Sequence, residues 1–225
     1  MAALNRAVLP APKFAPGFTL TEMAVVLAIV ALLVGGMMLP MSAQYDLRQV
    51  SETRRLLADT GEALYGYAAS HTAGNGKPYL PCPDTDGNGS ENRNGNACAS
   101  QEGDLPWADL GLGRQDAWGR PLHYRVSAVF SNNATGFGLT ASGDLRVCES
   151  SACTAVLAAT LPAVILSYGK NGAATPVDTD ELANRDGNTD FVDHPPSSSG
   201  NFDDLVAWLP PTLLFNRMIA AGRLP

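Results

Sequence analysis

Gly17-Phe18-Thr19-Leu20-Thr21-Glu22 is the stretch that decides the fold, and nineteen residues without a charge, 23–41, follow it. A short segment with Arg6 and Lys13 as its only charged residues precedes it. A carboxylate on a membrane-spanning helix is costly, at roughly 2.5 kcal/mol or more at the centre of the span and less toward its end. Glu22 is therefore a candidate functional residue.

The order of a glycine, an aromatic residue, an acid and an apolar run resembles the N-terminus of type IV prepilins and of type II secretion pseudopilins. The resemblance implies that a prepilin peptidase cleaves between Gly17 and Phe18 and methylates the new amine of Phe18. It also implies that Glu22 pairs with the amine of a neighbouring subunit during filament assembly. Thr21 departs from the family, which usually has an apolar residue there.

Two other interpretations of the N-terminus stay open. One is an ordinary secretory signal with Met41-Ser42-Ala43 as its cleavage site, although its apolar part is longer than the 7–15 residues expected. The other is a plain membrane anchor, because about 20 apolar residues suffice to span a bilayer. Neither interpretation accounts for Glu22 or for the junction between Gly17 and Phe18.

The chain is expected to divide into four segments. They are a cleaved leader (1–17), a transmembrane and assembly helix (18–41), an amphipathic continuation of that helix (42–70) and a globular periplasmic domain (71–225). The continuation is predicted because five apolar residues recur at helical spacing: Leu47, Val50, Leu57, Leu64 and Ala68. Beyond it we expect strands at 124–130, 145–148 and 164–168, a strand or short helix at 204–209 and a terminal helix at 212–221. Two long polar loops cover 71–106 and 171–201.

The composition limits the function classes. The chain has 15 basic and 22 acidic residues and a net charge of −7. This balance argues against a nucleic-acid partner, because phosphates are neutralised by basic patches. It is compatible with divalent cations. No spacing typical of a nucleophilic, zinc-protease or phosphate-binding site is found, so we do not expect an enzyme.

The four cysteines form two close pairs in the sequence, Cys82 with Cys98 and Cys148 with Cys153. An even number after a targeting sequence indicates two disulfides in an oxidising compartment. Local pairing is the simplest of the three connectivities that four cysteines allow. Zinc is disfavoured, because neither pair has the two-residue spacing of typical zinc ligands.

Three segments of the globular half resemble the major pseudopilins of type II secretion. Residues 116–124, DAWGRPLHY, match a D-x-W-G-x-P-x-x-Y signature; 166–172, LSYGKNG, match a glycine turn; and 204–208, DLVAW, match a D-I-x-x-W ending. The resemblance implies calcium bound by the turn and the loop after it. Asn171 stands where the family's turn has an aspartate, and Asp204 matches the second ligand. The intervening loop supplies further acids: Asp178, Asp180, Glu181, Asp186 and Asp190.

A second candidate calcium site follows from the residues alone. Asp84, Asp86 and Asn88 stand at positions 1, 3 and 5 of an EF-hand-like pattern, and a glycine stands at position 6. The match fails at position 12, which is Gly95 instead of a bidentate glutamate. A cluster of Asx and glycine turns held by the Cys82–Cys98 disulfide explains the same composition. Calcium is the candidate cofactor at either loop, and no cofactor is certain.

We therefore expect an α+β, pilin-like fold: a long N-terminal helix, its first half transmembrane, packed on a small antiparallel β-sheet with disulfide-stapled loops. The expected function is that of a structural subunit of a pseudopilus in type II secretion. A minor type IV pilin for adhesion, motility or DNA uptake and a membrane-anchored periplasmic calcium-binding domain are the alternatives. The expected location is the bacterial inner membrane, single-pass, with later extraction into a filament. The expected partners are pilin-like subunits, the prepilin peptidase, the inner-membrane assembly platform and the membrane itself.

Overall fold

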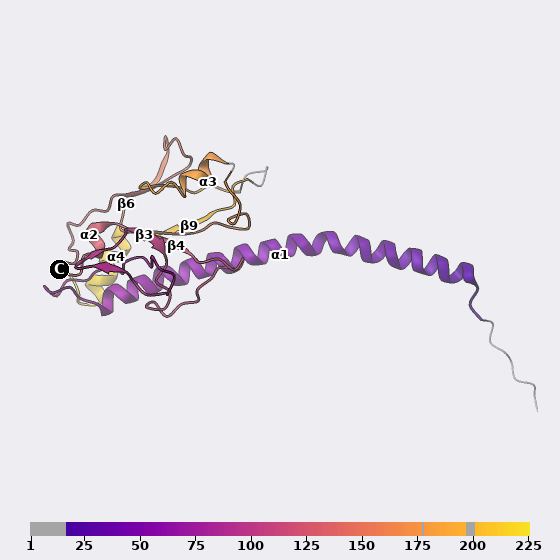
Figure 1. Ribbon diagram of the computed structural model, residues 1–225, viewed down its shortest axis with the longest axis horizontal. Helices are drawn as coiled ribbons and strands as arrows, with labels where there is room; N and C mark the ends of the chain where they lie inside the picture. The colour runs from indigo at the N-terminus through magenta and orange to yellow at the C-terminus, as the bar shows by residue number, and fades with distance from the viewer. Residues whose placement is uncertain (1–16, 177, 197–200) are drawn as a thin grey trace, which may run out of the picture. The chain divides into compact units, whose positions relative to one another are not determined.

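The computed structural model describes residues 17–176, 178–196 and 201–225, without the side chains of 36–43 (Figure 1). Of the predicted leader, residues 1–16 lie outside the described residues. The chain divides into two compact units, one ending at Asp46 and the other Leu47–Pro225.

Helix α1 spans Leu20–Ser70. Within the described residues, no helix combines the length and the apolar character that a membrane crossing requires. A span needs about 20 consecutive, predominantly apolar residues. The predictions of a transmembrane first half of the helix and of a single-pass inner-membrane location are therefore wrong.

The part of α1 that belongs to the second unit is amphipathic. Leu57, Leu64 and Ala68 are buried in the main hydrophobic core, as their helical spacing predicts. Leu47, at the start of this part, is exposed instead. Helix α4 (Pro211–Ala220) lies beside the end of α1, and Arg217 of α4 forms an ion pair with Glu62 of α1 (Figure 1).

The strands of the described residues form three sheets instead of the single small antiparallel sheet that was expected. The central sheet has the order β3-β4-β7-β9, made of Glu102–Asp104, His123–Val126, Ala163–Ser167 and Leu205–Trp208, and all its pairs are antiparallel. A second sheet has the order β6-β5-β8, made of Val156–Leu161, Leu145–Cys148 and Asp190–Val192. In it β5 and β8 run parallel. A short hairpin pairs β1 (Arg93–Asn94) with β2 (Ala97–Cys98).

Strand β7 shows how the layers are arranged, because both of its faces are buried. Ala163 and Ile165 belong to the main core with α1 and α4, whereas Val164 and Leu166 belong to a second core with Phe191 of β8. Successive side chains of a strand point to opposite faces. The central sheet is thus covered by helices on one face and by the second sheet on the other.

Three predicted segments differ from the structure. The loop expected at 71–106 contains the short strands β1, β2 and β3. The strand expected at 124–130 ends at Val126, and helix α2 (Ala128–Ser131) follows it. The turn forms because the Ser127 carbonyl accepts a hydrogen bond from Phe130 N, and Phe130 packs against Phe137 and Phe215. The loop expected at 171–201 contains helix α3 (Thr179–Ala183) and strand β8.

Both predicted disulfides are present. Cys82 is joined to Cys98, and Cys148 is joined to Cys153. The first ties β2 to the chain before the 84–92 turn, and the second closes the turn that follows β5. These bonds fit an extracytoplasmic or otherwise oxidising location.

Candidate functional site

The predicted processing site lies on exposed chain just before α1. Gly17 and Phe18 are exposed and non-helical. Thr19 caps the helix, because its Oγ1 accepts a hydrogen bond from Glu22 N at 3.2 Å. Glu22 Oε2 in turn accepts from Thr19 N and from Thr19 Oγ1, both at 2.8 Å. This reciprocal pair is a capping box, a role of Glu22 that the sequence analysis missed.

The charge of Glu22 is stabilised by this arrangement. The backbone N–H of Thr19, and next its hydroxyl, hold the pKa of the Glu22 carboxyl below its usual range. Glu22 therefore carries a negative charge at neutral pH at the start of α1, where the unpaired N–H groups of a helix favour an anion.

The first turns of α1 expose a series of large apolar side chains. Phe18 and Leu20 are 84% and 88% exposed. Their exposed neighbours along the helix are Met23, Val25, Val26, Leu27, Ile29, Val30, Leu32, Leu33 and Val34. An apolar surface of this extent marks an interaction site on a protein.

An acidic cluster lies in the second unit, where three segments of the chain meet. Glu181 comes from α3, and Asp203 and Asp204 directly precede β9. One carboxylate oxygen from each of the three lies within 4.8 Å of the others. Asn171, in the turn after β7, joins the cluster because its Nδ2 donates to Glu181 Oε1 at 2.7 Å. The structure thus brings together the two predicted ligands, Asn171 and Asp204.

Three side chains of the cluster, those of Asn171, Asp203 and Asp204, each have one terminal atom in a hydrogen bond. Asp203 Oδ2 accepts a hydrogen bond from Asn171 N at 3.1 Å, and Asp204 Oδ2 accepts one from Asn184 Nδ2 at 2.9 Å. The Asn184 amide is itself fixed by both backbone groups of Val192 on β8. The side chains are therefore oriented before any ligand arrives.

The other terminal atom of each of these side chains has no partner. Asn171 Oδ1, Asp203 Oδ1 and Asp204 Oδ1 are buried, and no polar atom of the described residues hydrogen-bonds to them. Asp204 is 3% exposed. A buried oxygen without a partner costs about 1–3 kcal/mol, so three together call for a ligand that satisfies all of them.

The surroundings of Asp203 and Asp204 in the cluster make their ionisation unfavourable. Burial, together with the charges of Glu181 and Asp203, raises the pKa of Asp204 to about 7 against the opposing effect of its hydrogen bond from Asn184. Burial also raises the pKa of Asp203, although the N–H groups of Asn171 and Lys170 oppose the shift. A site that resists its own negative charge attracts a cation.

The donor set fits a hard cation. Calcium takes six to eight oxygen ligands from carboxylates, amide carbonyls and water. Glu181, Asp203 and Asp204 supply carboxylates, Asn171 supplies an amide oxygen, and no sulfur or imidazole belongs to the group. The cluster could therefore hold a metal ion, and it is the one such group of acids, cysteines and histidines within the described residues.

The EF-hand-like loop at 84–92 uses its oxygens differently. Asp84 Oδ1 accepts from Asp86 N and Gly87 N, and Asp84 Oδ2 accepts from Gly89 N at 2.6 Å. Both oxygens of Asp86 accept from Asn88. Burial opposes ionisation of Asp84, but the backbone N–H groups outweigh it and hold its pKa below the usual range. The carboxylates of this loop are occupied by the turn that they stabilise.

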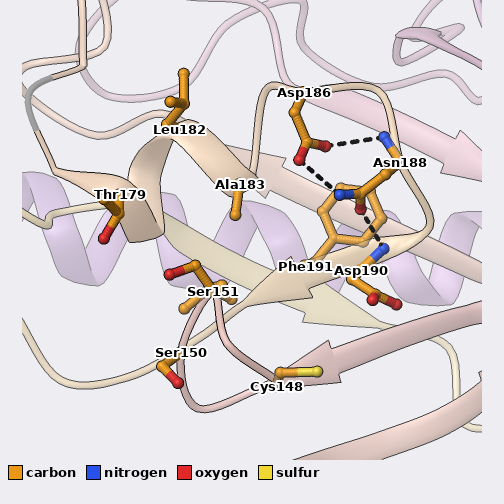
Figure 2. A pocket seen from close by; sticks show the side chains of 11 residues that line it. Cys148, Ser150, Ser151, Thr179, Leu182, Ala183, Asp186, Asn188, Asp190 and Phe191 are labelled. Atoms are coloured by element: carbon orange, nitrogen blue, oxygen red, sulfur yellow. Dashed lines mark hydrogen bonds between the residues drawn. The ribbon is translucent and has the colours of Figure 1, made fainter. Parts of the chain in front are cut away.

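The other loop acids that the sequence suggested as ligands, Asp178, Asp180, Asp186 and Asp190, have local partners. Asp178 caps α3, and Asp180 accepts from Ser151 N at 2.8 Å. Figure 2 shows a pocket of about 210 Å³ beside α3 and β8, where Asp186 bonds to Asn188 and Asn188 bonds to Asp190 N. Asp190 also pairs with Arg146 through two hydrogen bonds. This pocket does not include the three acids of the cluster.

Glu181 was predicted from the sequence as one of several loop acids, whereas Asp203 was not predicted. The available signal was the doublet of Asp203 and Asp204 directly before an apolar strand, since consecutive acids beside a buried segment require a shared partner. Comparisons of the chain with known protein families, with curated proteins and with solved structures found no match.

Proposed function

We propose that this chain is a structural subunit of a pilin-like filament that assembles in an oxidising compartment. The observation that carries the proposal is the continuous apolar surface of α1 between Leu20 and Val34, which is exposed in the single chain. Equivalent helices of neighbouring copies would cover one another's apolar side chains. The area removed from water supplies the driving force for assembly, at about 25 cal/mol per Å².

The N-terminal motif supports this proposal and suggests the order of events. A prepilin peptidase would cleave the exposed bond between Gly17 and Phe18 and methylate the Phe18 amine. Glu22 would then pair with the amine of a neighbouring subunit. Secretion is favoured over a surface fibre by the resemblance of 116–124 to the pseudopilin signature. A minor type IV pilin is the alternative, and neighbouring genes for a secretin and a secretion ATPase, or for retraction and adhesion, would separate the two.

The test exploits the two roles of Glu22. Glu22→Gln keeps a side chain that can complete the capping box, but it removes the charge. Glu22→Ala removes both. If assembly requires the pairing of charges, both variants give little sheared filament in the native cells, whereas wild type gives filament that starts at N-methylated Phe18.

The opposite pattern would contradict the proposal. Normal filament from Glu22→Gln with loss in Glu22→Ala would assign Glu22 to helix capping alone. Normal filament from both, or a mature chain that does not begin at Phe18, would leave no assembly role for the motif. Cellular level and thermal stability of each variant serve as the control for folding.

We also propose that the acidic cluster binds calcium. The specific support is the set of buried oxygens without partners on Asn171, Asp203 and Asp204. Magnesium demands near-ideal octahedral geometry and retains its water, so it fits such a cluster less well. Calcium should raise the unfolding temperature of the chelator-treated protein, and magnesium at the same concentration should have a much smaller effect. Equal responses to both ions, or none, would contradict calcium binding.

A further inference from the structure

Arg120 lies on the far side of the Asn171 turn from the acidic cluster. Its guanidinium donates hydrogen bonds to two successive carbonyls, through Nη1 to Gly169 O and through Nη2 to Lys170 O at 2.9 Å. The planar fork of an arginine is suited to hold two acceptors at once. Both of these hydrogen bonds go to carbonyls of the turn, and neither goes to an acid of the cluster.

The same two peptide units face the cluster with their other ends. In a trans peptide the N–H points opposite to the C=O, and the chain has no cis peptide among its described residues. Gly169 C=O shares its peptide with Lys170 N–H, and Lys170 C=O shares its peptide with Asn171 N–H. The Asn171 N–H donates to Asp203 Oδ2 at 3.1 Å, and the Lys170 N–H lowers the pKa of the same carboxyl, so both N–H groups act on Asp203.

Two peptides are thus held between a cation and an anion. Arg120 fixes and polarises the two carbonyl groups. On the opposite side of the peptides, Asp203 Oδ2 accepts the hydrogen bond from Asn171 N, and Asp203 Oδ1 has no partner. The fit is tight. Gly169 has a φ of 59°, and a Cβ there would overlap Asp203 Oδ1. A Cβ on Gly172 would lie 2.7 Å from Arg120 Nη1.

Arg120 is itself positioned by Asp116, in the turn that resembles the pseudopilin signature. Asp116 Oδ1 accepts from Arg120 N at 2.9 Å, and Asp116 Oδ2 accepts from Ser167 Oγ at 2.5 Å. Ser167 Oγ also accepts from Gly169 N at 3.3 Å. Asp116 and Ser167 are buried, so the arginine is anchored to the strand that leads into the Asn171 turn.

We infer that Arg120 is a positioning residue for the cation site, which orients Asp203 Oδ1 as a ligand through the Gly169–Lys170 and Lys170–Asn171 peptides. The inference rests on the proposed binding of calcium. Mutation of the residues that orient a metal ligand through hydrogen bonds typically lowers the metal affinity 10–100-fold. A positive charge that merely lay near the site would have the opposite effect, because it would repel a cation and its removal would tighten binding.

This difference in sign makes the test decisive. Calcium alone is titrated by calorimetry into the full-length chain, as wild type, Arg120→Met, Arg120→Lys and Arg114→Met. We expect Arg120→Met to bind calcium at least about tenfold more weakly, and Arg120→Lys, which keeps the charge without the planar fork, to lie between it and wild type. Arg114 is exposed in the preceding turn, so Arg114→Met is the charge-matched control and should bind within about twofold of wild type.

The unfolding temperature without calcium shows whether each variant is folded, and Arg120→Lys carries the test if Arg120→Met is not. Unchanged or tighter binding by folded Arg120 variants would overturn the inference while leaving calcium binding intact. Wild-type protein that binds no calcium would overturn both the proposed cation site and the inference.

Discussion

The 84–92 loop and the Asn171–Asp204 cluster are built from the same residue types, and they use them in opposite ways. In the loop, the backbone N–H groups of the turn fold onto Asp84 and occupy both of its oxygens. In the cluster, the N–H and amide donors hold one oxygen each of Asp203 and Asp204 and leave the other without a partner. An acid-rich turn stabilises itself, whereas acids that converge from distant segments require an external ligand.

The largest effect is expected when the 84–92 loop loses the Asp84 carboxylate that accepts its hydrogen bonds. Asp84→Ala leaves three buried or partly buried backbone N–H groups without their acceptor, each worth about 1–3 kcal/mol, so the free energy of unfolding should fall by roughly 5 kcal/mol. Calcium should not reverse the loss. Urea unfolding with and without calcium measures it, and Asp86→Ala, at an exposed position, should cost about 1 kcal/mol. A loss that calcium restores would turn the loop into a metal site.

The pH dependence of the metal-free protein sharpens the other side of the comparison. The pKa of Asp204 is raised by burial from 3.8 to about 7, so the folded state binds a proton more tightly than the unfolded state. Stability should therefore fall as the pH rises from 4 to 7, by as much as about 4 kcal/mol from this group. Urea unfolding in the presence of a chelator between pH 4 and 8 tests this, and Asp204→Asn should flatten the decline. An equally steep decline in the variant would assign it to another group.

Calcium should compensate for that decline. At a concentration 100 times its dissociation constant, a ligand that binds only the folded state adds about 2.7 kcal/mol. We expect this gain at pH 7.5 in wild type and its loss in Asp204→Asn, where the buried anionic ligand is gone. Thermal unfolding with calcium or chelator gives the comparison. A full calcium response in Asp204→Asn would exclude Asp204 as a ligand.

The smallest effect is expected at the ion pair between Arg146 of β5 and Asp190 of β8. Asp190 and Arg146 pair at the surface, and exposed ion pairs contribute about 0–1 kcal/mol. Arg146→Met should therefore change stability by less than about 1 kcal/mol, with the calcium response unaltered. If this variant weakened the response to calcium as strongly as Asp204→Asn, the cluster would not be the binding site.

The sequence predicted those features that depend on periodicity or short-range pairing. Helical spacing identified the buried residues Leu57 and Leu64, and close cysteines identified both disulfides. The transmembrane prediction relied on a charge-free run that the described residues do not support as a span. The parallel pairing of β5 with β8 was missed, because a three-residue strand inside a polar loop has no recognisable period.

The candidate site was predicted only where a family motif supplied a position. Asn171 and Asp204 were placed by resemblance, but Asp203 and Arg120 were not. Their roles depend on which end of a peptide faces the cluster, and residue identity alone does not determine this. Composition alone does not distinguish the 84–92 loop from the cluster as a candidate calcium site, since both are rich in acids, amides and glycines.

The hydrogen bond between Asn171 N and Asp203 Oδ2 joins residues 32 positions apart. It joins the two ends of the segment 171–203, which carries α3 and β8. The entropy lost on closing a loop grows only with the logarithm of its length, so each doubling costs only about 0.6 kcal/mol more. Related chains could therefore lengthen or shorten the turns of this segment at little thermodynamic cost, provided that Phe191 of β8 stays in the second core and Glu181 of α3 stays in the cluster. Those turns are accordingly the part of the fold in which we expect related chains to differ most.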